Sequence, residues 1–396
     1  MTSFVTGLTC SECGRTYDHR EAQGTCVEDG RPLLVEYDLG GIRRTVRRDD
    51  LAARIPTMWR YRELLPVEED ENIVSLGEGF TPMLLSDTVA SLLGVAQVWI
   101  KDEGRNPTGT FKARGASCGV SRAMDLGISD VALPTAGNAG GAWACYGAAV
   151  GLGVHVAVPS EAPAITAIEC RAHGADVIEV EGAIDAASRH LDGRIAEERW
   201  FDVSGYREPY RLDGKRTLGF EIAEQLGWRR PDAIVYPTGG ALALLGIWRA
   251  WVQLIELGWV EPPLPRLIAV QSTGCAPVVR AFESRAEDTE PFEGAGTVAS
   301  GLLVPASIGH KLALRAIRHS GGTAIAVPDE AIIDAVATMA REGAVLASPE
   351  AAATLAGAVA LRERGDLAPE DRVVLVATGS GHKYPEVVER AAGPGG

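Results

Sequence analysis

The 396-residue sequence predicts an α/β protein with mainly parallel sheets, preceded by a small N-terminal ribbon. Two observations predict the α/β class. Short β-branched runs alternate with alanine-rich helical stretches from about residue 96 onward, and their spacing is that of strand–helix–strand units. A third observation predicts the ribbon, because the pair Cys10 and Cys13 lies in an opening segment with few long apolar runs.

The expected elements follow one another in a regular order after the ribbon. A basic linker around residues 43–48 and an aromatic, charged segment at 59–66 lead into the alternating region. We expect strands at 98–101, 131–133, 155–158, 177–180, 233–236, 267–270, 323–327 and 373–377, and the first helices at 112–126, 140–150, 164–173 and 183–199. As domains, we expect a ribbon-like segment over 1–40, a large domain over 41–106 and 208–396, and a small α/β domain over 107–207.

Composition and charge exclude several classes of partner. The formal net charge of −15 disfavours nucleic acid and anionic membranes. No apolar run reaches the roughly 18 residues that a membrane span needs. The start of the chain lacks the pattern of a secretory signal, so we expect a cytoplasmic enzyme. Seven widely spaced cysteines do not suggest a disulfide scaffold.

A loop at residues 106–111 leads into Lys112, the expected first residue of a helix. Pro107 and Gly109 favour the loop. A lysine at a helix N-terminus lies at the positive end of the helix dipole, which disfavours its charged form, and partial burial acts in the same direction. Imine formation requires a neutral amine. A surface lysine is the ordinary alternative, but the surrounding loop favours an imine-forming Lys112.

Three further loops each follow an expected strand and contain glycine. Backbone N–H groups between a strand and a helix suit a carboxylate or a phosphate. Each loop taken alone is about equally typical of a plain tight turn. The loops comprise Thr135, Ala136, Gly137, Asn138 and Ala139; Thr238, Gly239, Gly240, Ala241 and Leu242; and Thr378, Gly379 and Gly381.

Together the four loops resemble those of the fold type II PLP enzymes, in particular the threonine synthase family and its paralogues. The resemblance runs from about Trp59 to Glu386 and includes the segments Ser75–Gly79 and Ser348–Ala352. It implies a tryptophan synthase β-like fold with PLP between two α/β domains. It also implies roles for individual residues: Lys112 for the Schiff base, Asn138 for the PLP ring oxygen, Thr238, Gly239, Gly240, Ala241 and Leu242 for the PLP phosphate, Thr378 for the pyridine nitrogen, and Thr135, Ala136, Gly137 and Ala139 for the substrate.

The chain departs from the family's pattern on the substrate side. Ala136 and Ala139 stand where the family usually has hydroxyls, and the segment 300–305 lacks the arginine of typical members. A charge-assisted hydrogen bond is worth about 1.5–3 kcal/mol, so these losses would weaken O-phosphohomoserine binding unless other groups replace them. The sequence offers Arg211, Lys215, His310 and Lys311 as replacements.

The resemblance extends to the ribbon, because some threonine synthases carry an N-terminal zinc ribbon. Here Cys10, Cys13 and Cys26 are followed by Asp29 at the place of a fourth cysteine. Zinc accepts carboxylate oxygen, so these four residues can close a tetrahedron. His19 is an alternative fourth ligand. The sequence is also consistent with a ribbon that has lost its metal.

We therefore predict a PLP-dependent lyase of the threonine synthase type that converts O-phosphohomoserine into threonine and phosphate through Lys112. The alternative is a paralogue that catalyses β-elimination or β-replacement on serine, phosphoserine or threonine. Thr378 is a neutral partner for the ring nitrogen, which favours elimination and replacement chemistry. A non-catalytic binding protein is a third possibility, which Lys112 disfavours. The resemblance implies a homodimer.

Overall fold

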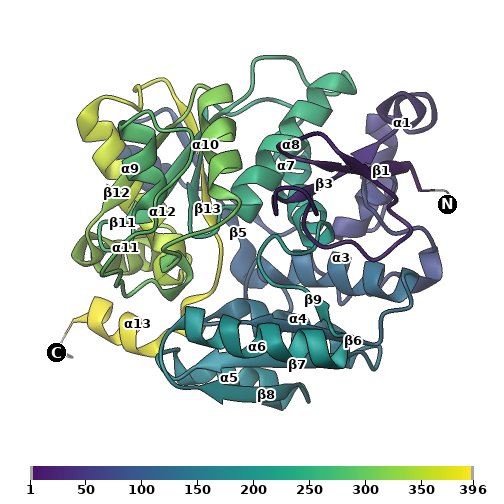
Figure 1. Cartoon of the computed structure of the whole chain (residues 1–396). Coiled ribbons are helices and arrows are strands. Elements are labelled where there is room, and N and C mark those ends of the chain that lie inside the picture. The colour runs from purple at the N-terminus through teal and green to yellow at the C-terminus, as the bar shows by residue number, and fades with distance from the viewer. Residues whose placement is uncertain (1–2, 394–396) are drawn as a thin grey trace. The chain divides into compact units, whose positions relative to one another are not determined.

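The computed structural model describes residues 3–393 (Figure 1). The chain forms two compact units. The first comprises the chain up to Phe80 together with Lys112–Thr217, and the second comprises Thr81–Phe111 together with the chain from Leu218 onward. The functional domain boundaries given above stay a prediction. Within residues 3–393, no helix is both long enough and apolar enough to cross a membrane.

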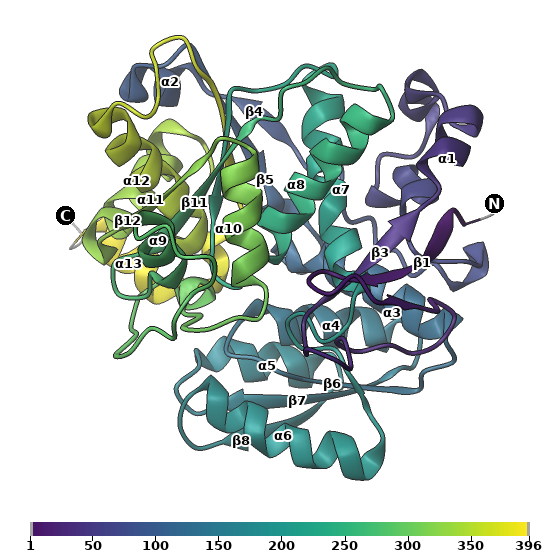
Figure 2. The same cartoon turned by 45° about the horizontal axis from the view of Figure 1, so that its top comes forward.

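A three-stranded antiparallel sheet opens the first unit and is drawn in purple in Figure 2. Its strands β1 (Val5–Cys10), β2 (Thr16–Tyr17) and β3 (Leu33–Tyr37) lie in the order β2-β1-β3. Leu8 and Val35 are cross-strand partners and both are buried, which gives this small sheet an apolar face. The predicted ribbon is confirmed. Short helices follow it: α1 (Leu39–Thr45), η1 (Arg48–Ala53), η2 (Met58–Leu64) and η3 (Asp70–Asn72).

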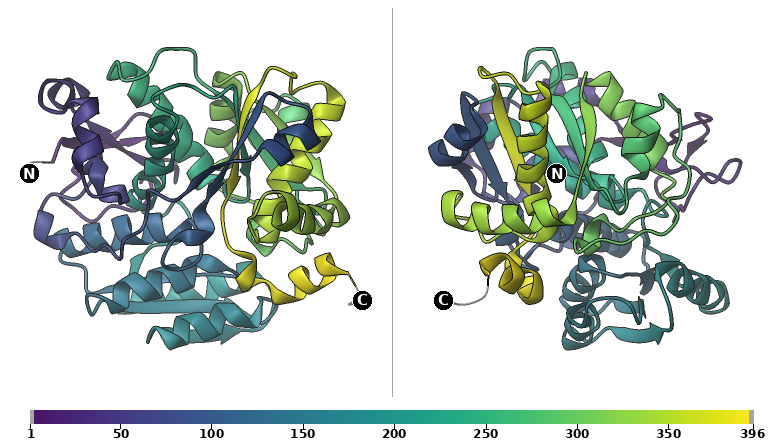
Figure 3. Two further views of the ribbon diagram at one scale, coloured as in Figure 1. Left: turned by 180° about the vertical axis from the view of Figure 1, so that it is seen from behind. Right: turned by 90° about the vertical axis from the view of Figure 1, so that its left-hand side faces the viewer.

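A four-stranded parallel sheet forms the rest of the first unit, in the order β8-β7-β6-β9. Successive strand side chains point to opposite faces, so Val131 and Leu133 pack against one helical layer while Ala132 packs against the other. Three helices cover the first face and α6 covers the second, and Figure 3 shows the sheet from two sides. The elements are α3 (Lys112–Asp125), β6 (Asp130–Pro134), α4 (Asn138–Ala148), β7 (Gly153–Pro159), α5 (Ala164–Ala172), β8 (Asp176–Val180), α6 (Ile184–Glu198) and β9 (Phe201–Asp202).

A six-stranded sheet lies at the centre of the second unit, in the order β12-β11-β10-β13-β5-β4, and only β4 runs antiparallel to its neighbour. Its strands are β4 (Met83–Leu85), β5 (Gln97–Asp102), β10 (Ala233–Pro237), β11 (Arg266–Ser272), β12 (Thr323–Val327) and β13 (Arg372–Ala377). The helices of this part are α2 (Asp87–Leu93), η4 (Glu103–Arg105), α7 (Tyr210–Gln225, which begins in the first unit), α8 (Leu242–Glu256), α9 (Pro277–Glu283), η5 (Ser300–Leu302), α10 (His310–His319), α11 (Asp329–Glu342), α12 (Pro349–Arg364), η6 (Gly381–Lys383) and α13 (Pro385–Ala392). The predicted α/β class with mainly parallel sheets is confirmed.

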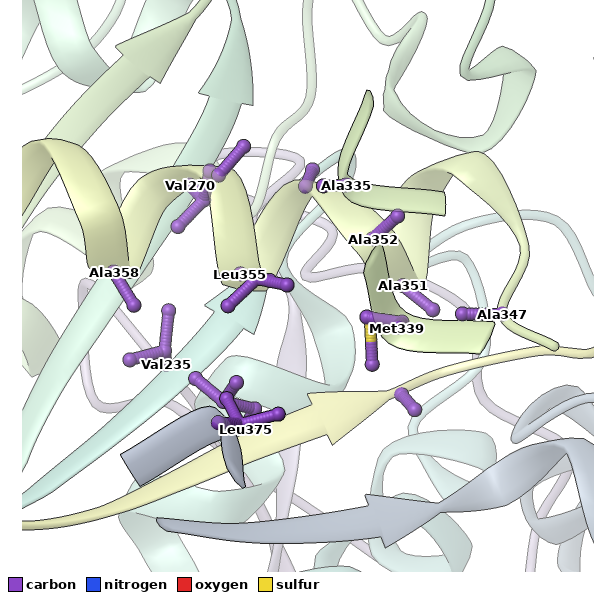
Figure 4. Packing of buried hydrophobic residues seen from close by; sticks show 14 of the residues in the cluster. Val235, Val270, Ala335, Met339, Ala347, Ala351, Ala352, Leu355, Ala358 and Leu375 are labelled. Atoms are coloured by element: carbon purple, nitrogen blue, oxygen red, sulfur yellow. The ribbon is translucent and has the colours of Figure 1, made fainter. Parts of the chain in front are cut away.

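Small side chains let α12 lie close against this sheet. Figure 4 shows Leu355 and Ala358 of α12 beside Val235, Val270 and Leu375 of three neighbouring strands. At Gly357, a Cβ atom would come within 2.6 Å of Val270 Cγ2. The close packing holds the central strands rigidly, and the loops at their carboxyl ends are therefore built on a fixed frame.

Candidate active site

The segment before Lys112 is held by the loop that follows β13. Phe111 N donates to Thr378 O at 2.9 Å, and Ser380 N donates to Gly109 O at 2.9 Å. Gly109 has a φ of +67°, a conformation that suits glycine. The second unit thus brings together two of the four predicted loops, and Lys112 is the next residue along the chain.

Lys112 is the first residue of α3 and is partly exposed. The helix behind it is buried without interruption from Ala113 to Ala123. Packing therefore fixes the backbone at Lys112, while its side chain remains accessible to a ligand at the helix N-terminus.

The loop after β6 presents backbone amides at the start of α4. Gly137 is the N-cap residue and has no neighbouring atom within 4 Å of the position of a Cβ, so open space lies beside it. Asn138 and Ala139 begin the helix, and both are partly exposed. The Thr135 hydroxyl is used inside the loop, since it donates to Gly137 O at 2.9 Å and accepts from Gly137 N. The loop can therefore bind an anion mainly through N–H groups.

The loop after β10 forms a second set of amides at the start of α8. Ala241 is the N-cap residue with a φ of +66°, which is strained for a residue with a side chain. At Gly239 a Cβ would lie 2.3 Å from Gly301 O, so only glycine fits. Gly240 has room for a side-chain atom, because the nearest atoms lie 4.0 Å from its Cβ position, an ordinary van der Waals distance. Such a cradle at a helix N-terminus suits a phosphate.

His310, the first residue of α10, holds this glycine loop. It is fully buried; its Nε2 lies 3.0 Å from Gly239 O and its Nδ1 lies 3.2 Å from Thr289 Oγ1. Burial lowers the pKa of His310, so the ring is neutral near pH 7. Since a carbonyl only accepts, Nε2 carries the proton. The structure therefore assigns His310 to the loop backbone rather than to the cationic role suggested by the sequence.

Thr378 follows β13 and is buried. Its carbonyl accepts the Phe111 amide, but no residue in the described range 3–393 hydrogen-bonds its hydroxyl. A hydroxyl with this spare capacity on a buried residue is available to a polar ligand atom.

Glu78 joins α3 and α4 to the loop at residues 75–79. This fully buried carboxylate accepts from Trp59 Nε1 at 3.0 Å, Leu76 N at 2.8 Å and Tyr146 OH at 2.7 Å, and it lies 2.6 Å from Ser117 Oγ. Ser117 is in α3 and Tyr146 is in α4. Burial and the charge of Glu78 raise the pKa of Tyr146 well above its ordinary value, so the phenol stays protonated and donates.

The ribbon gathers four metal-ligating side chains. Atoms of Cys10, Cys13, Cys26 and Asp29 all lie within 4.8 Å of one another. Cys10 Sγ is 3.4 Å from both Asp29 carboxylate oxygens, and Cys13 Sγ is 3.6 Å from Cys26 Sγ. A tetrahedral zinc ion with Zn–S bonds of about 2.3 Å spaces its ligand atoms by about 3.5–3.8 Å, so the group fits one ion. His19 is not part of the group, because its Nε2 lies 3.1 Å from Glu68.

Comparisons with known proteins agree with this geometry. Residues 74–379 match the model of a family described as "Pyridoxal-phosphate dependent enzyme". The chain belongs to that family. It is 36% identical to the threonine synthase of Methanocaldococcus jannaschii over 97% of this chain and 94% of the relative. It is also 36% identical to the threonine synthase of Methanosarcina acetivorans, over 96% and 93% respectively.

Solved structures support the same fold. Maize serine racemase has a TM-score of 0.67 at 20% identity, covering 79% of this chain and 92% of that chain. The processed threonine deaminase isoform 2 of Solanum lycopersicum also has a TM-score of 0.67, at 24% identity, with coverages of 80% and 84%. The predicted fold type II architecture and the assignment to a threonine synthase-like PLP-dependent enzyme are confirmed.

The residues present fit a bound PLP. The Gly240 loop offers room and a helix N-terminus for its phosphate, and Thr378 offers a hydroxyl on a buried residue. In the first unit, Lys112 and Asn138 begin two neighbouring helices of the same helical layer. Which of these residues contact the cofactor and the substrate stays a prediction. The sequence assigned no role to Glu78, although this residue lies in the family-like segment 75–79. It also did not predict that His310 holds the glycine loop.

Proposed function

We propose that this enzyme converts O-phosphohomoserine into threonine and phosphate, with Lys112 carrying the cofactor. The observation on which the proposal rests is the position of Lys112. It opens the buried helix α3, directly after a loop that is hydrogen-bonded to the backbone of Thr378. Two relatives that match nearly the whole chain are named threonine synthase, which supports the same activity.

The protein groups have distinct tasks in this proposal. Bound PLP supplies an electron sink for the bonds at the substrate's α- and β-carbons. The Lys112 amine removes the α-proton as general base. Asn138 contacts the cofactor ring oxygen, residues 238–242 bind the cofactor phosphate, and Thr378 donates to or accepts from the ring nitrogen. The loop at residues 135–139 binds the substrate carboxylate at the start of α4, but not through Thr135 N or Gly137 N, which donate to Ala157 O and Thr135 Oγ1.

The reaction requires that protons and the leaving group move in order. Protons leave the α- and β-carbons, the C–O bond at the γ-carbon breaks, and phosphate departs with the bonding pair. Water then adds its oxygen to the β-carbon, and protons return to the carbon skeleton. A lysine placed at the α-carbon can serve both the removal and the return of a proton.

One observation favours a second candidate function. Ala136 and Ala139 are partly exposed at the start of α4, and an alanine methyl donates no hydrogen bond to a phosphate. The second candidate is therefore β-elimination or β-replacement on serine, phosphoserine or threonine. The two functions are separated by ranking kcat/KM for O-phosphohomoserine, O-phosphoserine, serine and threonine. A value for O-phosphohomoserine above about 10⁴ M⁻¹s⁻¹, with the other three at least tenfold lower, establishes threonine synthase activity.

The role of Lys112 has its own test. Borohydride treatment of the purified protein should bleach its yellow colour and fix the cofactor to one lysine. The chain has only five lysines: Lys101, Lys112, Lys215, Lys311 and Lys383. Peptide mapping that places the label on any lysine other than Lys112 would refute the assignment.

We also propose that Cys10, Cys13, Cys26 and Asp29 hold one structural zinc ion. A homodimer, which the family resemblance implies, and a cytoplasmic location, which the lack of a secretory-signal pattern suggests, remain predictions. Light scattering on the purified protein tests the first, and fractionation of the source cells tests the second.

A further inference from the structure

A cluster of buried charged side chains lies in the first unit against the first turn of α3. Arg211 and Lys215 come from the first turns of α7 and are only 5% and 2% exposed. At Gly115, one turn after Lys112, a Cβ would lie 2.9 Å from Lys215 Cε and 3.1 Å from Arg211 O. The absence of a side chain at Gly115 therefore lets α7 and its lysine pack directly on α3.

Glu208 acts on Lys215 and is also hydrogen-bonded to Arg211 and to the start of α7. Glu208 is buried and accepts from Arg211 Nε at 2.8 Å and from the backbone N atoms of Tyr210 and Arg211 at 2.6 and 3.0 Å. The charges that act on Lys215 are those of Lys112, Arg211 and Glu208. Three basic groups, of which Arg211 and Lys215 are buried, thus lie close to Glu208, and the charge of Asp202 acts on Arg211 as well. Burial and the charges of Lys112 and Arg211 lower the pKa of Lys215.

Arg211 offers a donor in the same cluster. Its Nη2 is buried and has no hydrogen-bond partner among residues 3–393, and its guanidinium lies 5.3 Å from the Trp143 ring of α4. A buried charged donor without an acceptor is unfavourable. An anion that accepts from Nη2 and from Lys215 removes that penalty and balances the excess of basic groups.

We propose that Lys215 is a specificity-determining residue that binds the distal anionic group of the substrate. Under the function proposed above, on which this inference rests for the identity of the ligand, that group is the γ-phosphate of O-phosphohomoserine. A phosphate offers several oxygens to the ammonium and the guanidinium at once, and its double charge matches two basic groups better than a single carboxylate does. Lys215 thus supplies the contact that Ala136 and Ala139 cannot make.

The test compares Lys215→Met and Lys215→Arg in PLP-loaded enzyme. Losing one charge-assisted contact should raise KM for O-phosphohomoserine about 10- to 100-fold in Lys215→Met, with kcat within about threefold. Lys215→Arg should restore part of the affinity. The KM of a substrate without a distal anion, such as serine, should not change. Glu208→Gln provides a matched control of opposite sign, because removing the carboxylate should lower KM for O-phosphohomoserine.

A second readout does not depend on turnover. In holoenzyme whose cofactor has been fixed by borohydride, the cofactor phosphate fills its own site, and inorganic phosphate is the probe. Phosphate should raise the melting temperature of the parent enzyme, raise it more in Glu208→Gln, and leave Lys215→Met unchanged. If Lys215→Met does not fold, the anion site is still tested by comparing the phosphate-induced rise in melting temperature between Glu208→Gln and the parent enzyme.

The outcomes separate this inference from the proposed function. An unchanged KM in Lys215→Met, or phosphate protection that neither substitution alters, overturns the role of Lys215 even if the enzyme makes threonine. A parent enzyme that does not turn over O-phosphohomoserine overturns the proposed function. Loss of phosphate protection in Lys215→Met would then still support an anion site at Lys215.

Discussion

Replacing Glu78 with glutamine tests whether one buried carboxylate holds α3 and α4 together. If the amide oxygen keeps the place of Oε1, it still accepts from Trp59 Nε1. The amide nitrogen then stands where Oε2 accepted from Leu76 N and Tyr146 OH. The Tyr146 hydroxyl can rotate and accept, but the Leu76 N–H cannot. Leu76 is 43% exposed, so water can reach its N–H and the larger cost is the lost charge in a fully buried site. Hydrogen bonds to a charged group are worth about 1.5–3 kcal/mol, and several weaken together here, for a total of about 3 kcal/mol.

The assay is thermal unfolding of the holoenzyme, followed by circular dichroism. A loss of about 3 kcal/mol should lower the melting temperature by about 6 to 12 °C if the first unit unfolds as one body of ordinary size. Tyr146→Phe is the matched control, because it removes a donor without leaving a buried donor unpaired, and it should cost only about 1 kcal/mol. In the double variant the two costs should not add. A Glu78→Gln protein that melts within 1 °C of the parent would refute this reasoning.

Three further predictions concern the proposed cofactor and metal sites. Thr378→Val keeps the side-chain shape but removes the hydroxyl, so kcat should fall about 10- to 1,000-fold with PLP content unchanged; unchanged activity would point to another ring partner, such as Ser380. Elemental analysis should find about one zinc per chain in protein purified without chelators and less than about 0.2 in Cys13→Ser, and a parent protein as poor in zinc as the variant would exclude a structural site. Because the pKa of buried His310 lies below its unfolded value of 6.5, its contribution to stability is present above pH 6.5 and is lost as the pH falls through the folded pKa. PLP retention should therefore decline at acidic pH, and His310→Gln should flatten that decline; equal pH profiles in the two proteins would contradict it.

The features predicted from sequence are those that neighbouring residues determine. The eight expected strands from 98–101 to 373–377 all lie within strands of the structure, because β-branched runs of the right length favour extended backbone. Lys112 does open α3, since Pro107 and Gly109 favour a loop just before a helix-forming stretch. The three cysteines and Asp29 of the ribbon also meet, as their spacing predicts for a pair of knuckle turns.

Other features depend on residues that are far apart in the chain. Glu78 meets Ser117 39 positions later and Tyr146 68 positions later, and no local pattern links them. His19 was the alternative to Asp29 as a zinc ligand, but in the fold its Nε2 lies 3.1 Å from Glu68 and outside the cysteine cluster. The sequence offered His310 as a substrate-binding cation, but the ring is buried and its Nε2 lies 3.0 Å from Gly239 O.

The sequence by itself determined the fold class, the family and the position of Lys112 at the start of a helix, because strand propensity, turn residues and short motifs act over a few neighbouring positions. Only the tertiary structure decided which charges share a buried space. Lys215 and Arg211 are ordinary residues of a helix in the sequence, and they form a cationic cluster because Gly115 lets α7 pack against α3. Burial and long-range packing control the energy of a charge, and a local sequence pattern contains neither.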